Sequence, residues 1–136
     1  NMGAGVIDRL RQLNFEVQGI NFGAKSDQSI GDTQIIAANK RTEMYGSMRE
    51  WLKTGGRIPA DDKKLEFELL SPMYSYDAHN AMLLETKKDM KKRGISSPDE
   101  SDALALTFAY PVVSRSIELQ EEHEADENYD PIWGNS

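Results

Sequence analysis

Residues 96–108 read SSPDESDALALTF, a stretch that places acidic residues at the head of an apolar segment. Ser97 has the side chain of a helix N-cap, Pro98 suits the first helical position, and Glu100 stands where a capping box requires it. We therefore predict a helix that begins after Ser97. Residues 103–109 are almost entirely apolar, which favours burial of this helix against a sheet.

Two carboxylates of this helix are candidate site residues. Asp99 and Asp102 are three residues apart, so both side chains project from the same face of the first turn. A favourable contact with the helix dipole would account for Asp99. Asp102 adjoins the apolar run, where a carboxylate is expected to be paired, hydrogen-bonded or metal-bound. Burial favours Asp102 as the principal metal ligand. If the ligand position lay one helical turn earlier, Asp99 would take that role instead.

The composition limits the class of protein. The chain has 136 residues, enough for one domain, and no cysteine, which excludes disulfides and thiolate metal ligands. No apolar run is long enough to span a membrane.

The net charge of −7 comes from residues 116–136, which contain seven acidic residues and no Lys or Arg. Residues 1–115 contain 16 acidic and 16 basic residues. Such an acidic tail is typical of a solvated, disordered terminus. Its apolar end also fits a partner-docking peptide, with candidate residues Tyr129, Ile132 and Trp133.

Apolar periodicity and turn residues predict further elements. In chain order these are a helix after a Gly3–Gly5 turn, a strand at 15–20, a helix at 33–54, a helix at 61–70, and a hairpin with strands at 72–76 and 81–86. Residues 23–32 are predicted to form a loop. The glycine turn lacks the full dinucleotide-binding pattern, so a tight turn is favoured over a phosphate cradle.

A basic cluster lies directly upstream of the acidic helix and consists of Lys87, Lys88, Lys91, Lys92 and Arg93. Near an active site these side chains would attract the phosphates of DNA in a salt-sensitive way, independent of base sequence. A solvated helix face would have the same composition, and both interpretations stay open.

The sequence resembles the nuclease domain of the large terminase subunit, the motor that cuts and packages the DNA of tailed bacteriophages. Residues 97–108 are similar to the end of that domain. Four more segments are similar in the same order, and together the five cover about residues 2–110: MGAGVIDRL at 2–10, VQGINFG at 17–23, NKRTEMY at 39–45 and ETKKDMKKRG at 85–94.

This resemblance implies an α/β, ribonuclease H-like fold with a β-hairpin insertion, in which residues 1–115 are part of the nuclease domain and residues 116–136 the acidic tail. In this class, three or more carboxylates hold two Mg²⁺ or Mn²⁺ ions for phosphodiester hydrolysis. The first two carboxylates belong to strands that precede the segment resembled by residues 2–10. We therefore expect an N-terminally truncated domain that retains Asp99 and Asp102, binds metal weakly and cuts DNA poorly alone.

The resemblance also implies partners: double-stranded DNA, the portal protein and the small terminase subunit, in the cytoplasm of a host that carries a virus or prophage. An unpaired sheet edge would favour a homodimer.

Two alternative functions remain. One is a non-catalytic packaging-protein interaction fragment that docks through its acidic tail. The other, a junction-resolving nuclease, is disfavoured because its early carboxylates should lie within the chain and it has no need of this tail.

Overall fold

The computed structural model of the protein describes residues 2–111. In this range the chain forms five helices and one two-stranded antiparallel sheet, which confirms the predicted mixed α/β class. The elements are α1 (Met2–Gln12), α2 (Lys40–Lys53), α3 (Lys63–Leu70), β1 (Tyr74–Tyr76), β2 (Met82–Leu84), α4 (Lys87–Lys92) and α5 (Asp99–Leu106). Among the described residues, no helix combines the length and the apolar character needed to cross a bilayer.

The predicted hairpin is confirmed, with strands shorter than expected. Tyr74 pairs with Leu84 and Tyr76 with Met82. The turn is stabilised by Asp77, whose Oδ1 accepts hydrogen bonds from the backbone N–H groups of residues 79 and 81, and these bonds lower the pKa of Asp77. Local turn chemistry therefore sets the register of the two strands.

The long helix predicted at 33–54 is wrong at its beginning. Residues 36–38 run beside β2 instead, where the N–H of Met82 donates to the carbonyl of Ile36 and the N–H of Ala38 donates to the carbonyl of Met82. Asn39 then caps α2, since its Oδ1 accepts from the N–H of Thr42 at 2.9 Å. These contacts hold residues 36–38 in an extended conformation, so the helix begins only at Lys40.

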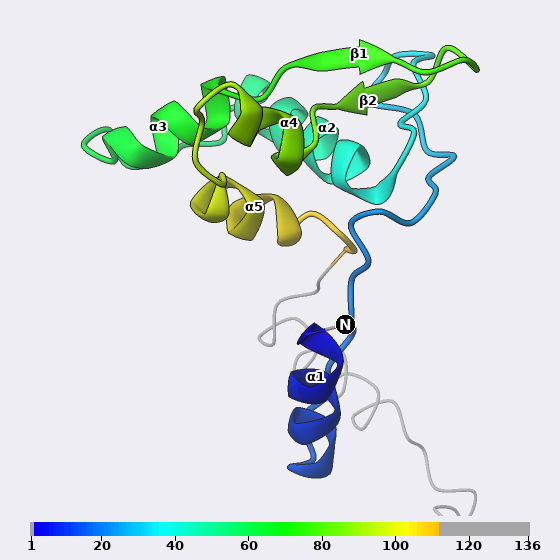
Figure 1. Cartoon of the computed structure of the whole chain (residues 1–136), viewed down its shortest axis with the longest axis vertical. Coiled ribbons are helices and arrows are strands. Elements are labelled where there is room, and N and C mark those ends of the chain that lie inside the picture. The colour runs from blue at the N-terminus through cyan, green and yellow to red at the C-terminus, as the bar shows by residue number, and fades with distance from the viewer. Residues whose placement is uncertain (1, 112–136) are drawn as a thin grey trace, which may run out of the picture.

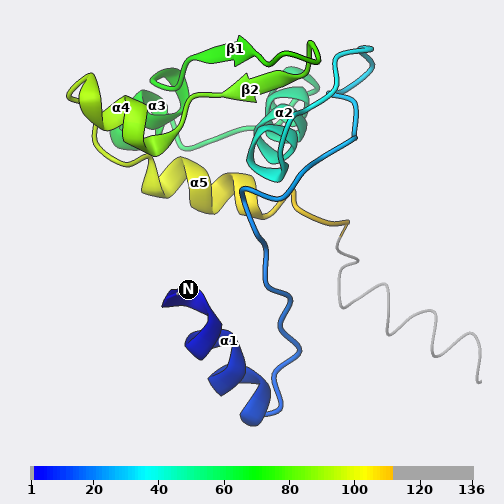
Figure 2. The same ribbon diagram turned by 45° about the vertical axis from the view of Figure 1, so that its right-hand side comes forward.

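The N-terminal prediction also differs from the structure. Gly3 and Gly5 lie inside α1 rather than in a turn before it. Residues 15–20 form no strand, because within the described residues their backbone bonds only to α1, through Phe15 N–H to the carbonyl of Leu10 and Arg11 to the carbonyl of Val17. Figures 1 and 2 show α1 standing away from the other elements, at the end of an extended connection. As a result, Val6 and Phe15 are exposed.

Helix α2 organises the core. In both ribbon views it lies between the hairpin on one side and α5 on the other. Its buried residues Met44 and Met48 pack with Ala105 and Ala109. Helix α5 therefore packs against helices α2 and α3, so the prediction of burial against a sheet is wrong. The small alanine side chains allow this close contact between helices, which brings the first turn of α5 next to the first turn of α2.

Helix α3 agrees with the predicted helix at 61–70 except at its beginning, because it starts at Lys63. Asp62 is the N-cap and accepts from the N–H of Leu65 at 3.0 Å. Phe67 and Leu70 are exposed. Leu65 and Glu68 are three residues apart, so they share one face of α3, and both are buried.

Candidate functional site

The first turn of α5 is held by a side chain from another helix. The predicted capping box of Ser97 and Glu100 is wrong: the N-cap is Pro98, and the hydroxyl of Ser97 donates to Asp99 Oδ1 at 2.7 Å. Instead, Glu68 Oε2 accepts from the backbone N–H groups of Glu100 and Ser101, at 2.7 and 2.9 Å. A buried carboxylate on α3 therefore replaces the local cap and joins the two helices.

Asp102 lies in a buried polar cluster beneath this turn. Only 7% of its side chain is exposed, and its Oδ1 accepts from the Tyr45 hydroxyl at 2.7 Å and from Arg41 Nε at 3.2 Å. Arg41 Nη1 donates to the carbonyl of Glu85 at 2.7 Å, and the guanidinium lies 5.0 Å from the centroid of the Tyr45 ring. The expectation that a carboxylate at this position is paired is confirmed.

Tyr45 connects this cluster to the core. Burial raises the pKa of Tyr45, so its hydroxyl stays protonated across the physiological range. The same hydroxyl lies 2.8 Å from Ser101 Oγ. A phenol has one proton, and here it points at Asp102, so Ser101 is the donor in the second contact. The two contacts fix both the tyrosine and the carboxylate.

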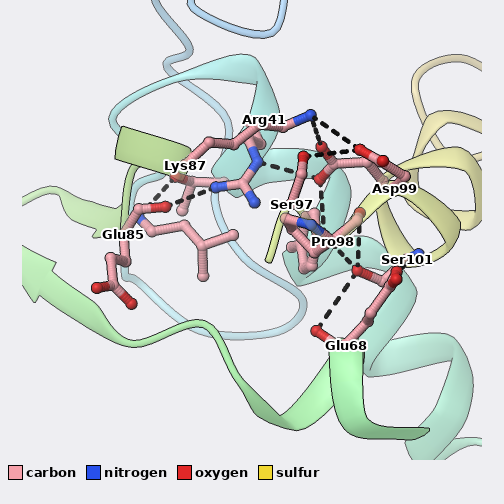
Figure 3. Close-up of polar contacts among 12 residues, drawn as sticks. Arg41, Glu68, Glu85, Lys87, Ser97, Pro98, Asp99 and Ser101 are labelled. Atoms are coloured by element: carbon pink, nitrogen blue, oxygen red, sulfur yellow. Dashed lines mark hydrogen bonds and ion pairs between the residues drawn. The ribbon is translucent and has the colours of Figure 1, made fainter. Parts of the chain in front are cut away.

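Lys87 links the two candidate carboxylates. Its Nζ lies 2.6 Å from Asp102 Oδ2 and 3.9 Å from Asp99 Oδ1. Figure 3 shows the lysine reaching across from the start of α4 toward Asp99. No hydrogen-bond donor is aligned on Asp102 Oδ2, so the short contact with Lys87 is an ion pair. Asp99 and Asp102 thus share a single ammonium group at the surface of the domain.

The rest of the predicted basic cluster divides into two kinds of residue. Lys92 pairs with Asp89 at 2.6 Å, and Arg93 pairs with Glu85 at 2.6 Å while donating to the carbonyl of Ser71 at 2.9 Å. The bond from Arg93 lowers the pKa of Glu85. Lys88 and Lys91 are exposed and form no ion pair within residues 2–111. Arg93 therefore stabilises the fold, and Lys88 and Lys91 are the candidates for binding phosphate.

Sequence reasoning missed the residues that hold Asp102. Arg41 and Tyr45 are four apart, so they share one face of α2, but nothing local indicates that this face meets α5. The only signal is that both belong to the segment NKRTEMY, which resembles the terminase family. Glu68 gave no signal at all, because an acidic residue on a short helix is ordinarily exposed.

The site fits a hard cation only in part. Residues 2–111 contain no group of three or more His, Asp or Glu side chains that could hold a metal. Asp99 and Asp102 nevertheless offer carboxylate oxygens, the ligands that Mg²⁺ and Mn²⁺ prefer. The Lys87 ammonium, 2.6 Å from Asp102 Oδ2, places a positive charge between the two carboxylates, and this is the observation that supports a cation at this position.

Comparisons with known proteins add no identification: no protein-family model matches this chain, and no match was found among curated proteins. The candidate docking residues Tyr129, Ile132 and Trp133, with the whole acidic tail, lie outside the described residues. Any function assigned to the chain therefore depends on the α5 site and on the sequence motifs.

Proposed function

We propose that the chain is the C-terminal part of the nuclease domain of a phage or prophage terminase large subunit, with a ribonuclease H-like fold in the complete domain. The single observation that carries this proposal is the pairing of Asp99 and Asp102 around one ammonium group at the head of α5. The order of the five motifs along residues 2–110 adds support.

The residues present have separate roles in such a site. Asp99 and Asp102 would hold Mg²⁺ or Mn²⁺, which in this class supplies an activated water for in-line attack on phosphorus and stabilises the leaving oxygen. Arg41 and Tyr45 keep the Asp102 carboxylate oriented through its Oδ1 atom. Lys88 and Lys91 on α4 would attract the phosphates of double-stranded DNA.

Two carboxylates from one helix turn do not complete a two-metal site. We therefore expect the chain alone to nick supercoiled plasmid poorly or not at all in Mn²⁺. Robust nicking that is lost in Asp102→Asn would show that the site is complete in this chain and would contradict the proposal of a partial domain. The upstream coding sequence provides the complementary test: an apolar strand that ends in Asp a few residues before Asn1 supports the terminase assignment.

DNA binding is the activity that the chain itself should show. We expect the protein to bind duplex DNA of any sequence at low salt, and Lys88→Ala/Lys91→Ala to bind more weakly with a shallower salt dependence, because phosphate contacts release counter-ions. Fluorescence anisotropy measures both quantities. Equal binding by parent and variant would remove DNA from the proposed function.

One observation favours a second candidate, a non-catalytic packaging partner. Asp102 is already neutralised by Arg41 and Lys87, as a purely structural carboxylate would be. In that case the protein binds neither Mn²⁺ nor duplex DNA, and a pull-down with portal protein or small terminase subunit succeeds only when the acidic tail is present. A metal titration therefore separates the two candidates.

A further inference from the structure

We propose that Lys87 is an internal counter-ion at the divalent-cation position between Asp99 and Asp102, and that a divalent cation binds there by displacing it. The inference takes the class of ligand, a hard divalent cation, from the proposed function. It adds a residue that competes for that position, and its own observation is the placement of Lys87 Nζ against both carboxylates.

The two oxygens of Asp102 differ in what they can accept. Oδ1 is occupied by the Tyr45 hydroxyl and by Arg41 Nε. Oδ2 is buried, accepts no aligned hydrogen bond from residues 2–111, and lies 2.6 Å from the Lys87 ammonium. A hard cation such as Mg²⁺ sits roughly 2.0–2.1 Å from a ligating oxygen. The ammonium and the cation therefore compete for the same side of Oδ2.

The two basic side chains that neutralise Asp102, Arg41 and Lys87, differ in how easily they can move away from it. The Arg41 side chain is buried, donates to the carbonyl of Glu85 and lies over the Tyr45 ring. The Lys87 side chain is 48% exposed and stands at the first position of α4 on a flexible four-carbon stem. Lys87 can thus move into solvent without a change in the helix, whereas Arg41 stays and keeps the carboxylate in place.

Asp99 completes the position from the solvent side. Its side chain is 74% exposed, and its Oδ1 accepts from the Ser97 hydroxyl. The carboxylate is therefore open to a hydrated cation that also reaches Asp102 Oδ2 once Lys87 has moved away. Since Mg²⁺ and Mn²⁺ keep several bound waters at such sites, two carboxylates suffice for weak binding.

The test is a titration of the full chain with Mn²⁺ alone. Binding is measured as the loss of the free Mn²⁺ signal in electron paramagnetic resonance. Lys87→Met removes the competing charge and keeps a helix-forming side chain. We expect it to bind Mn²⁺ roughly threefold to tenfold more tightly than the parent, because a partly exposed ion pair is weak and its loss frees Oδ2. Lys63→Met is the matched control, since it removes an exposed, ion-paired lysine from the first position of another helix, α3, and its affinity should stay close to that of the parent.

The inference would be overturned if Lys87→Met bound Mn²⁺ no more tightly than the parent, or if Lys63→Met tightened binding by the same factor. A second measurement does not depend on any variant: Mg²⁺ should raise the acetylation rate of Lys87 relative to Lys88, as read by mass spectrometry, and an unchanged ratio would also overturn it. If parent and Lys87→Met bind Mn²⁺ equally, only the displacement fails. If neither binds, the metal site of the proposed function fails as well.

Discussion

Asp102 shows how one buried carboxylate connects several elements of the fold. Its Oδ1 atom joins α5 to α2 through Tyr45 and Arg41, and its buried Oδ2 atom contacts the half-exposed Lys87 of α4. Burial of such a charge is costly unless it is paired and hydrogen-bonded, which explains why three side chains surround it. The same partners fix the orientation of the carboxylate.

The Tyr45 hydroxyl is predicted to stabilise the fold. Tyr45→Phe removes the buried hydrogen bond to Asp102 Oδ1, so the free energy of unfolding should fall by about 1–3 kcal/mol. Urea unfolding followed by circular dichroism measures the loss. The control is Tyr76→Phe on the exposed β1, which should change stability by less than about 0.5 kcal/mol. Equal stability of the two variants would show that the buried hydrogen bond contributes little.

Glu85 is predicted to make stability depend on pH in the acid range. Its hydrogen bond from Arg93 lowers its pKa in the folded state. A carboxyl whose folded pKa lies below the unfolded value, about 4.3 for Glu, contributes stability above that value and loses it as pH falls through the folded pKa. Urea unfolding between neutral and acid pH should therefore show a smaller acid loss for Glu85→Gln than for the parent. Arg93→Gln should reduce the loss in the same way, and a parent-like loss in both variants would contradict this account.

At the scale of the elements, the first turn of α5 depends on α3. Glu68 accepts from two backbone N–H groups of α5, and the Lys64 ammonium contacts Glu100 Oε1 at 2.6 Å. The hydrogen bond with Glu100 raises the pKa of Lys64. The turn that carries Asp99 and Asp102 is thus positioned by a neighbouring helix rather than by its own cap.

Loss of this contact is predicted to loosen the candidate site. Glu68→Ala leaves two N–H groups of α5 unsatisfied, so the free energy of unfolding should fall by about 1–3 kcal/mol and the affinity for Mn²⁺ should fall with it. Glu66→Ala is the matched control, because Glu66 lies on the same helix but pairs only with the exposed Lys63. A parent-like stability of Glu68→Ala would contradict a role for Glu68 as the cap.

The elements differ in how far the sequence could predict them, for physical reasons. The hairpin was predictable because Asp77 and its neighbours form the turn locally. The beginning of α2 was not, because residues 36–38 pair with Met82, far along the chain. The capping box failed for the same reason, since a distant Glu68 takes its place. Asp99 and Asp102 could be found as site candidates from their spacing, whereas Arg41 and Tyr45 required the packing of α2 on α5.

At the scale of the whole molecule, the described residues leave apolar surface uncovered. Helix α1 packs against none of the other described elements, and the backbone of residues 15–20 is paired with no strand there. Val6, Leu13 and Phe15 are exposed on this N-terminal segment, and Leu70 and Tyr74 are exposed near the hairpin. Exposed apolar groups and unpaired extended backbone favour association.

We therefore predict that the protein dimerises through its N-terminal segment. Light scattering coupled to size exclusion should return a dimer mass for the parent. Val6→Asp/Phe15→Asp should shift the protein toward monomer, because it places charge on the uncovered surface. The matched control Glu16→Gln should leave the dimer intact. A monomer mass for the parent at high concentration would contradict the prediction.

The central claim is that Asp99 and Asp102 form a divalent-cation position at the head of α5. Paramagnetic broadening of the backbone amide signals by substoichiometric Mn²⁺ tests it most directly, because it locates the ion along the whole chain. The account predicts selective broadening around Lys87 and residues 99–102, lost in Asp99→Asn/Asp102→Asn. Broadening confined to the acidic residues of 116–136, or a pattern unchanged in the double variant, would contradict it.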